Sequence, residues 1–147
     1  MQDLPHHYKV MAQAQLEGDV ELSASQVESI RSAGPAEFGG PGDRWSPETL
    51  LVAAVADCFI LTFRAIARGS KLPWVSLSCK AEGTLERVER VTQFTEFVVQ
   101  ASLVIPPDTD PVRAERLMEK AEKGCLITNS LTGNSRLEAS ISVADSE

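Results

Sequence analysis

The stretch Ser46–Gly69 contains the longest apolar segment of the chain, and nearly every residue in its middle part is apolar. Ser46 is a good helix N-cap, Pro47 suits the first helical position, and Gly69 can end the helix. A helix that is apolar on nearly all sides must be buried on most of them. Because the segment is too short for a membrane span and includes Asp57, we predict a long buried helix of a water-soluble protein.

Alternating apolar and polar residues predict β-strands on both sides of this helix. The predicted strands cover Tyr8–Leu16, Val20–Ala24, Val27–Arg31, Val75–Leu85, Phe97–Ile105 and Leu137–Val143, of which the third has the weakest pattern. Glu17, Gly18 and Asp19 predict a turn, so the first two strands form a hairpin. The charged segment Glu86–Thr92 predicts a solvated turn between the fourth and fifth strands.

A second helix is predicted after Asp110, which can cap it, with Pro111 at the first helical position. Apolar residues then recur at helical spacing as far as Cys125, and the opposite side is rich in Lys, Arg and Glu. The pattern predicts an amphipathic helix with Cys125 at or near its end, on the buried side. The order of elements predicts an α+β fold with mainly antiparallel sheets, in a single domain over residues 1–147.

The composition excludes several classes of function. A net charge of −7 argues against general nucleic-acid binding, because phosphate contacts need a basic surface. Three cysteines, with no Cys-x-x-Cys pair among them, predict neither a disulfide framework nor a structural zinc site. A basic segment followed by an apolar leader is absent at the start of the sequence, so we expect a cytoplasmic protein.

Two further motifs carry no clear chemistry. His6 and His7 stand together without a second cluster of ligands, so they do not predict a metal site. They also leave a cysteine hydrolase without a well-placed base, which makes that class a weak alternative. The glycine-rich loop Gly34–Arg44 lacks the spacing of a phosphate-binding motif and is interpreted as the approach to the long helix.

The cysteines are the candidate reactive groups. Cys58 and Cys125 both lie on the buried seam of a predicted helix, where a core role and a reactive role are both compatible with the pattern. The stripe around Cys58 consists of Leu51, Val55, Cys58, Thr62 and Ala65. Cys79 points to the apolar side of its predicted strand, which is typical of a small buried hydrophobic residue.

The segment SPETLLVAAVADCF resembles the helix motif of the OsmC/Ohr family, the osmotically inducible and organic hydroperoxide resistance proteins. Pro47, Glu48 and Cys58 match that motif residue by residue, and CLITNS from Cys125 resembles the second cysteine motif of the family. The resemblance extends from about Phe38 to Val143. It implies an OsmC-like fold, formed as an intertwined homodimer with active sites at the dimer interface.

The resemblance also implies a chemistry. Cys58 would attack the hydroperoxide and form a sulfenic acid, Cys125 would resolve it as a disulfide, and a dithiol reductant would restore both thiols. No metal, haem, flavin or other cofactor is implied. In the family, Glu48 would hold an arginine that stabilises the thiolate, although its place also suits simple compensation of the helix dipole.

The activating arginine is where this sequence departs from the family pattern. The family has it near the first hairpin turn, which here contains only Glu17, Gly18 and Asp19. Arg31 and Arg44 are the remaining candidates. We therefore predict a homodimeric, cysteine-based peroxidase that reduces organic hydroperoxides and binds neither nucleic acid nor membranes. The alternative is a non-catalytic protein of the same fold that binds a small apolar ligand or senses redox state at the dimer interface.

Overall fold

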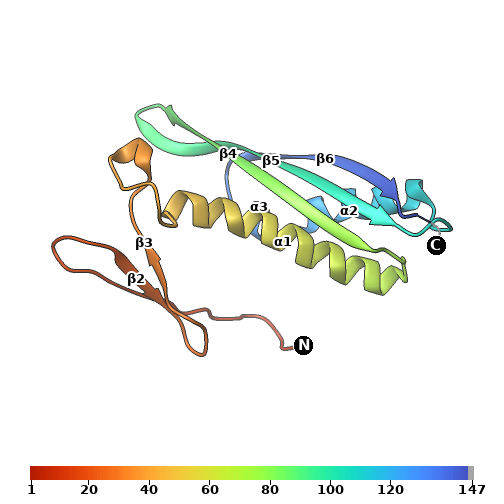
Figure 1. Ribbon diagram of the computed structural model, residues 1–147, viewed down its shortest axis with the longest axis horizontal. Helices are drawn as coiled ribbons and strands as arrows, with labels where there is room; N and C mark the ends of the chain where they lie inside the picture. The colour runs from red at the N-terminus through yellow and green to blue at the C-terminus, as the bar shows by residue number, and fades with distance from the viewer. Residues whose placement is uncertain (146–147) are drawn as a thin grey trace. The chain divides into compact units, whose positions relative to one another are not determined.

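The computed structural model describes residues 1–145 and divides into two compact units, Met1–Leu50 and Leu51–Glu147 (Figure 1). The long helix α1, Pro47–Ser70, begins in the first unit and continues in the second. The sequence predicts one domain over residues 1–147, and this stays a prediction. The chemistry predicted for the cysteines belongs to the second unit, whereas the candidate arginines belong to the first.

The N-terminal unit contains a three-stranded antiparallel sheet in the order β1-β2-β3, followed by the short helix η1, Ala36–Phe38. The strands are β1, Met11–Gln13, β2, Val20–Ser23, and β3, Ile30–Ser32. The predicted hairpin and third strand are therefore confirmed. The first strand is much shorter than the predicted Tyr8–Leu16, because only its middle residues pair with β2, and Leu16 is fully exposed at 99%.

The second unit contains a sheet in the order β4-β5-β6, built from β4, Ser76–Val88, β5, Val91–Ile105, and β6, Asn134–Val143. The predicted turn over Glu86–Thr92 is wrong, because β4 and β5 continue through most of that segment. The turn itself is reduced to Glu89 and Arg90, whose φ angles are 50° and 69°. Two left-handed residues form the tight hairpin that matches the twist of the strands, even though neither is glycine.

β4 and β5 are antiparallel, but β5 and β6 are parallel. The connection between the parallel strands carries α2, Pro111–Gly124, and the short helix α3, Leu126–Asn129, which the sequence pattern does not predict. A parallel pair requires such a crossover, since a tight turn cannot join two parallel strands. The α+β class is confirmed, and the sheets are antiparallel except at this one pair.

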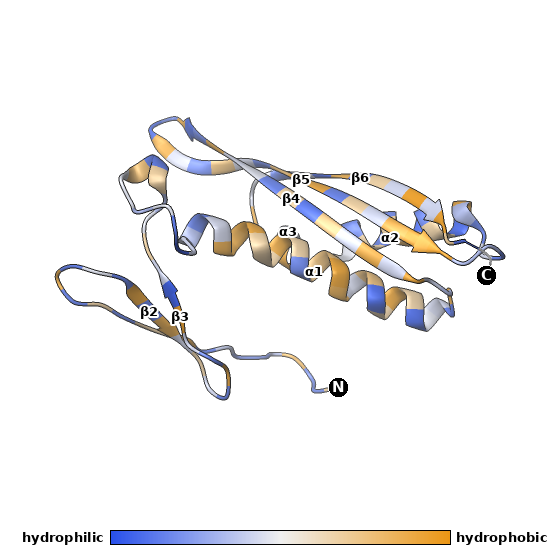
Figure 2. Ribbon diagram, in the orientation of Figure 1, coloured by the Kyte–Doolittle hydropathy of each residue, from blue (hydrophilic) through white to orange (hydrophobic). Residues whose placement is uncertain are grey.

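One face of the β4-β5-β6 sheet is apolar and packs against α1 and α2 (Figures 1 and 2). The fully buried residues of this core come from α1, β5 and α2: Val55, Phe59, Phe63, Ala67, Phe97, Val99, Ala101, Leu103, Ile105, Ala114, Met118 and Ala121. The opposite face is polar, and there Arg136 bridges Glu96 and Glu138 across and along the strands. The core thus lies on one side of the sheet and fixes both helices that carry the cysteines.

Both long helices begin as predicted. The hydroxyl of Ser46 accepts from the Thr49 N–H at 3.1 Å, and the Asp110 carboxylate accepts from the Val112 N–H at 3.0 Å. The end of α1 differs from the prediction: the helix continues past Gly69, and Lys71 takes the left-handed conformation with φ 56°. The Leu72 N–H then donates to the Ala67 carbonyl at 2.9 Å, which closes the last turn.

The helix α1 is buried along one side only, so the predicted burial on most sides is wrong for the single chain. Val55, Phe59, Phe63 and Ala67 line the buried side, whereas Leu61 is 51% exposed. The expectation that this segment is too short for a membrane span is wrong, because α1 is long and apolar enough by length and composition alone. Its buried side nevertheless forms part of the core described above. That role accounts for the apolar residues on this side.

Candidate functional site

Cys58 lies in the middle of α1, half-buried, and its sulfur faces the segment that joins α2 to α3. Its nearest partner on its own helix is Thr62, one turn later, whose Oγ1 lies 3.8 Å from Sγ. The two side chains share a stripe because residues four apart in a helix lie one above the other. The core contacts of Phe59, next to Cys58 in the chain, hold this part of α1 against the sheet.

Cys125 is the residue at which α2 ends and α3 begins, and its backbone is extended with φ −68° and ψ 110°. Its side chain is buried, with 2% exposed. Its carbonyl accepts from the Asn129 N–H at 3.0 Å and from the Thr128 hydroxyl at 3.1 Å. These bonds fix the joint, and they leave the N–H groups of the first turn of α3 without partners inside that helix.

The free N–H groups of this turn act on the sulfur of Cys58 and change its pKa. Burial raises the pKa of Cys58, but hydrogen bonds from the Ile127 N–H and from the Cys125 thiol lower it. The Thr62 hydroxyl and the Leu126 N–H lower it further, so the pKa of Cys58 lies below its ordinary value. Donors that bind the charged form favour that form. The site therefore promotes the thiolate of Cys58 without a charged side chain.

The pKa of Cys125 is shifted in the opposite direction, above its ordinary value. Burial raises its pKa, the N–H and hydroxyl of Thr128 oppose this, and the neighbouring Cys58 raises it again. Two adjacent thiols that share one proton resist losing both. The pair thus consists of a thiolate-prone sulfur on α1 and a thiol-prone sulfur at the α2–α3 joint.

The third cysteine behaves as a core residue. Cys79 lies on the apolar face of β4, opposite Ala101 of β5, and packs against the core. Burial, with a smaller contribution from Cys125, raises the pKa of Cys79 to about 11. A thiol with such a pKa is almost entirely protonated at neutral pH and reacts poorly as a nucleophile. The predicted structural role of Cys79 is in agreement with this environment.

Glu48 lies in the first turn of α1, within the N-terminal unit. Its Oε1 is buried, and no donor among residues 1–145 reaches it. A buried carboxylate oxygen without a partner is costly, so such a group points to a missing donor. A guanidinium is the partner that the family resemblance implies. Its role in catalysis stays a prediction.

Arg31 of β3 and Arg44 line one open hollow of the N-terminal unit together with Trp45 and Thr49. Arg44 is already paired, because its Nε lies 3.0 Å from the Asp19 carboxylate. Asp19, and Asp43 to a lesser degree, raise the pKa of Arg44. Within the described part of the chain, neither arginine is bonded to Glu48. Their proposed role towards Cys58 stays a prediction.

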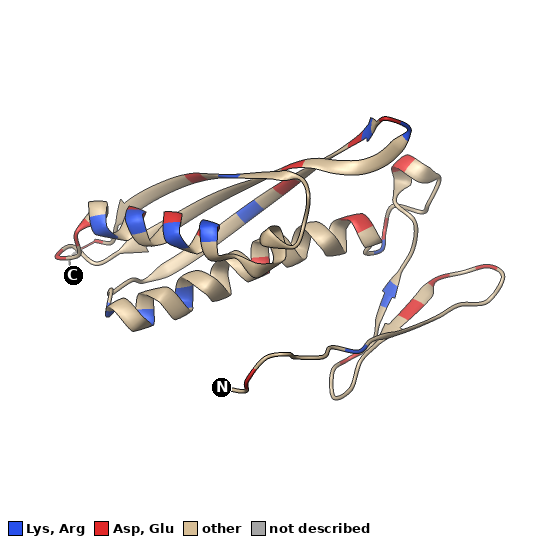
Figure 3. Ribbon diagram, turned by 180° about the vertical axis from the view of Figure 1, so that it is seen from behind, with Lys and Arg blue, Asp and Glu red and all other residues tan. Residues whose placement is uncertain are grey.

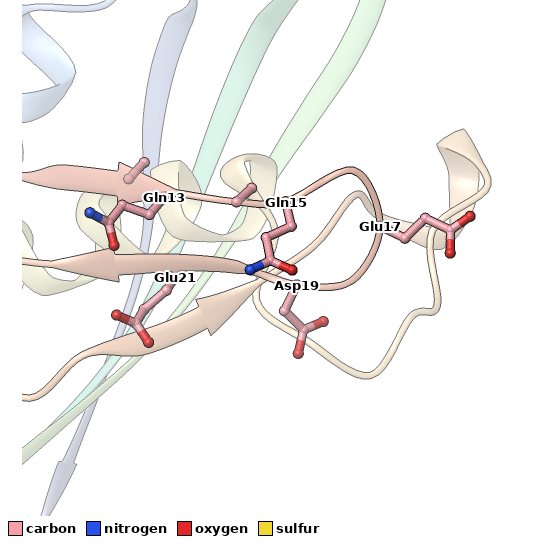
Figure 4. Close-up of a pocket in the computed structure, with 7 residues that line it drawn as sticks. Gln13, Gln15, Glu17, Asp19 and Glu21 are labelled. Carbon is pink, nitrogen blue, oxygen red and sulfur yellow. The ribbon is translucent and has the colours of Figure 1, made fainter.

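The turn of the first hairpin is acidic (Figure 4). Glu17, Asp19 and Glu21 line the hollow along β1 and β2, together with Gln13 and Gln15. Figure 3 shows the same concentration of acidic residues along this hairpin. The chain therefore has carboxylates where the family pattern led us to look for an arginine.

Of the predicted site residues, the structure brings Cys58 and Cys125 together in the second unit. Glu48, Arg31 and Arg44 belong to the other unit. The sequence reasoning missed two backbone donors, the N–H groups of Leu126 and Ile127, because backbone groups leave no trace in residue identity. It placed Thr62 on the stripe of Cys58 but assigned it no role.

Comparison with known proteins places the chain in context. Residues 40–140 match the family model described as OsmC-like protein. The uncharacterized protein YmaD of Bacillus subtilis is 31% identical over 112 residues, which cover 74% of this chain and 75% of that protein. An organic hydroperoxide resistance protein of Xanthomonas axonopodis pv. citri is 27% identical over 117 residues, covering 77% of this chain and 78% of that protein.

A solved structure confirms the architecture. An OsmC-like protein of unknown function from Vibrio cholerae superposes with a TM-score of 0.85 at 18% sequence identity. The superposition covers 92% of this chain and 100% of that one. At this identity the likeness concerns the fold alone, and it confirms the predicted OsmC-like α+β architecture.

Proposed function

The chain belongs to the OsmC-like protein family, and we propose that it is a thiol-dependent peroxidase that reduces organic hydroperoxides. A relative in this family is named an organic hydroperoxide resistance protein. The proposal assigns the first oxidation to Cys58, the resolution to Cys125, and the regeneration of both thiols to a small dithiol. Reaction at the cysteines needs no bound cofactor.

The proposed reaction has three steps: oxidation of Cys58, formation of a disulfide, and reduction of that disulfide. The Cys58 thiolate attacks the outer oxygen of the hydroperoxide, the O–O bond breaks, and the alkoxide leaves and takes up a proton as the alcohol. The sulfenic acid on Cys58 is then attacked by Cys125, which gives a disulfide and releases water. A dithiol reduces the disulfide by two thiol exchanges and is itself oxidised to a cyclic disulfide.

The observation that carries the proposal is the unequal pair of thiols. Burial raises the pKa of Cys58, but Ile127, Cys125, Thr62 and Leu126 together lower it below its ordinary value, whereas burial raises the pKa of Cys125. A peroxidatic cysteine must be ionised to attack, and a resolving cysteine must be near and still able to give up its proton. The two residues meet these separate requirements in the order that the resemblance assigns.

The test is consumption of cumene hydroperoxide with dithiothreitol as the reductant, measured for the wild type and three single variants. Cys58→Ser should abolish turnover. Cys125→Ser should still reduce one equivalent of peroxide, leaving a sulfenic acid that dimedone traps. Cys79→Ser is the matched control, because Cys79 is a core thiol, and it should keep turnover. Full turnover in Cys58→Ser would refute the proposal.

The surroundings of Arg44 and Glu48 favour a second function. Arg44 is held by Asp19, and the buried Oε1 of Glu48 has no donor within residues 1–145. Without an activating guanidinium, the same fold would act as a non-catalytic protein that binds a small apolar ligand or senses redox state. No peroxide turnover in the wild type, together with reversible formation of the Cys58–Cys125 disulfide, would favour this second function.

The assembly proposed is a homodimer in the cytoplasm. The exposed apolar residues of α1, such as Leu61 at 51%, support a covering surface from a second copy. Three free cysteines suit a reducing compartment. Light scattering after size-exclusion chromatography should give twice the mass of one chain, and a monomer at micromolar concentration would contradict the dimer.

A further inference from the structure

The residue one helical turn after Cys58 has a hydroxyl aimed at the reacting sulfur. Thr62 Oγ1 lies 3.8 Å from Cys58 Sγ, which is within hydrogen-bonding range for sulfur. Both side chains are half-buried, so water competes less for either group than at an exposed position. Apolar residues fill most of the inward positions of this helix, and a threonine there needs a reason.

The position of the Thr62 methyl group indicates why the hydroxyl of the same side chain points towards Cys58. A β-carbon placed on Gly124, the last residue of α2, would lie 3.8 Å from Thr62 Cγ2. The methyl therefore points towards the end of α2, and the hydroxyl branch of the same carbon points towards Cys58. A β-branched side chain has few rotamers in a helix, so its two branches keep fixed directions relative to each other.

We propose that Thr62 is a catalytic residue of this protein, whose hydroxyl donates a hydrogen bond to the Cys58 sulfur and holds it as the attacking anion. The bond joins a donor and an acceptor on one rigid helix, so little conformational freedom is lost when it forms. Thr62 keeps its own proton throughout, and the peroxide chemistry at sulfur is unchanged. The hydrogen bond is independent of the substrate, whereas the catalytic role rests on the proposed peroxidase function.

Few titratable groups act on the Cys58 sulfur. From the α2–α3 joint, Cys125 lowers the pKa of Cys58. From β4, Cys79 lies close enough to Cys125 for that thiol to raise its pKa, but it is not among the groups that shift the pKa of Cys58. On α1 itself, Asp57 and Arg64 are exposed and do not shift the pKa of Cys58. Within the second unit, a change in the ionisation of Cys58 after substitution of Thr62 can therefore be assigned to the lost hydroxyl.

The experiment titrates the reduced protein and follows the ultraviolet absorbance of the thiolate, with Cys58→Ser subtracted as the blank. Thr62→Val keeps the shape and the methyl group but removes the donor, and Thr62→Ser keeps the donor. Thr62→Val should move the ionisation of Cys58 to higher pH and slow single-turnover oxidation by cumene hydroperoxide about three- to tenfold below that pH, the range of one net hydrogen bond. Thr62→Ser should restore both.

The matched control is Thr92→Val on the exposed start of β5, which should change neither measurement. An unchanged titration in a folded Thr62→Val variant would overturn the proposal, and so would an equal shift in Thr62→Ser, because that variant retains a hydroxyl. If no protein, the wild type included, consumes peroxide while the titration still shifts in Thr62→Val, the peroxidase function is refuted and the hydrogen bond stands.

Discussion

The three thiols of the second unit should differ sharply in reactivity, and Cys79 gives the magnitude. Burial raises its pKa from the ordinary 9.0 to about 11. At pH 8 and below this lowers the thiolate fraction about a hundredfold. A more basic thiolate is intrinsically more nucleophilic, which restores roughly six- to tenfold. The net expectation is that Cys79 reacts roughly ten- to fifteenfold more slowly than an unperturbed thiol, before its restricted access is counted.

The assay is a time course with iodoacetamide on the reduced protein, quenched and digested so that each cysteine is followed on its own peptide. Near pH 8, Cys58 should be modified first and Cys79 last. The rate at Cys79 should rise about tenfold per pH unit until it levels off near pH 11. In denaturant the three rates should agree within a few-fold. Modification of native Cys79 as fast as Cys58 would refute the assignment of Cys79 to the core.

Three predictions concern stability. Phe63 is fully buried, and its ring centroid lies 5.5 Å from that of Trp74 in an edge-to-face arrangement. Phe63→Ala should therefore lower the free energy of unfolding by about 3–5 kcal/mol. Urea denaturation measures this, with Val112→Ala as the exposed control. Asp110→Ala removes the cap of α2 and should cost about 1 kcal/mol, whereas Asp110→Ser should lose only part of that. Arg136 pairs with Glu96 and Glu138 on the exposed face, so Arg136→Met should leave the free energy of unfolding nearly unchanged, and any small difference should shrink further at high salt.

The helix α2 could be predicted from the sequence because its signals are local. Asp110 and Pro111 mark its start, and the apolar spacing up to Cys125 marks its buried side. The ends of other elements depend on contacts made elsewhere in the chain. β4 and β5 extend to Val88 and Val91 because cross-strand pairing stabilises the charged residues there, and the left-handed Glu89 and Arg90 are a conformation that their identity does not indicate.

The parallel pair of β5 and β6 could not be predicted from strand patterns. Leu137–Val143 alternates in the same way whichever direction it pairs in, because the side-chain period of a strand is two in both cases. The direction is decided by the crossover through α2 and α3, whose length the sequence shows but whose path it does not. Alternation does fix which residues share a face, and Leu137, Ala139 and Ile141 pack against the core.

The activation of Cys58 shows why a site can be found in a sequence before its chemistry can be explained. A cysteine in the middle of a helix receives little help from the helix dipole, and this sequence has no arginine at the first hairpin turn to replace it. The donors that lower the pKa of Cys58 against its burial are led by the Ile127 N–H and the Cys125 thiol. A backbone N–H exists at every residue except proline, so only the path of the chain can show that one of them is free and points at a sulfur. An arginine added by a partner chain would therefore act on a thiolate that this chain already favours.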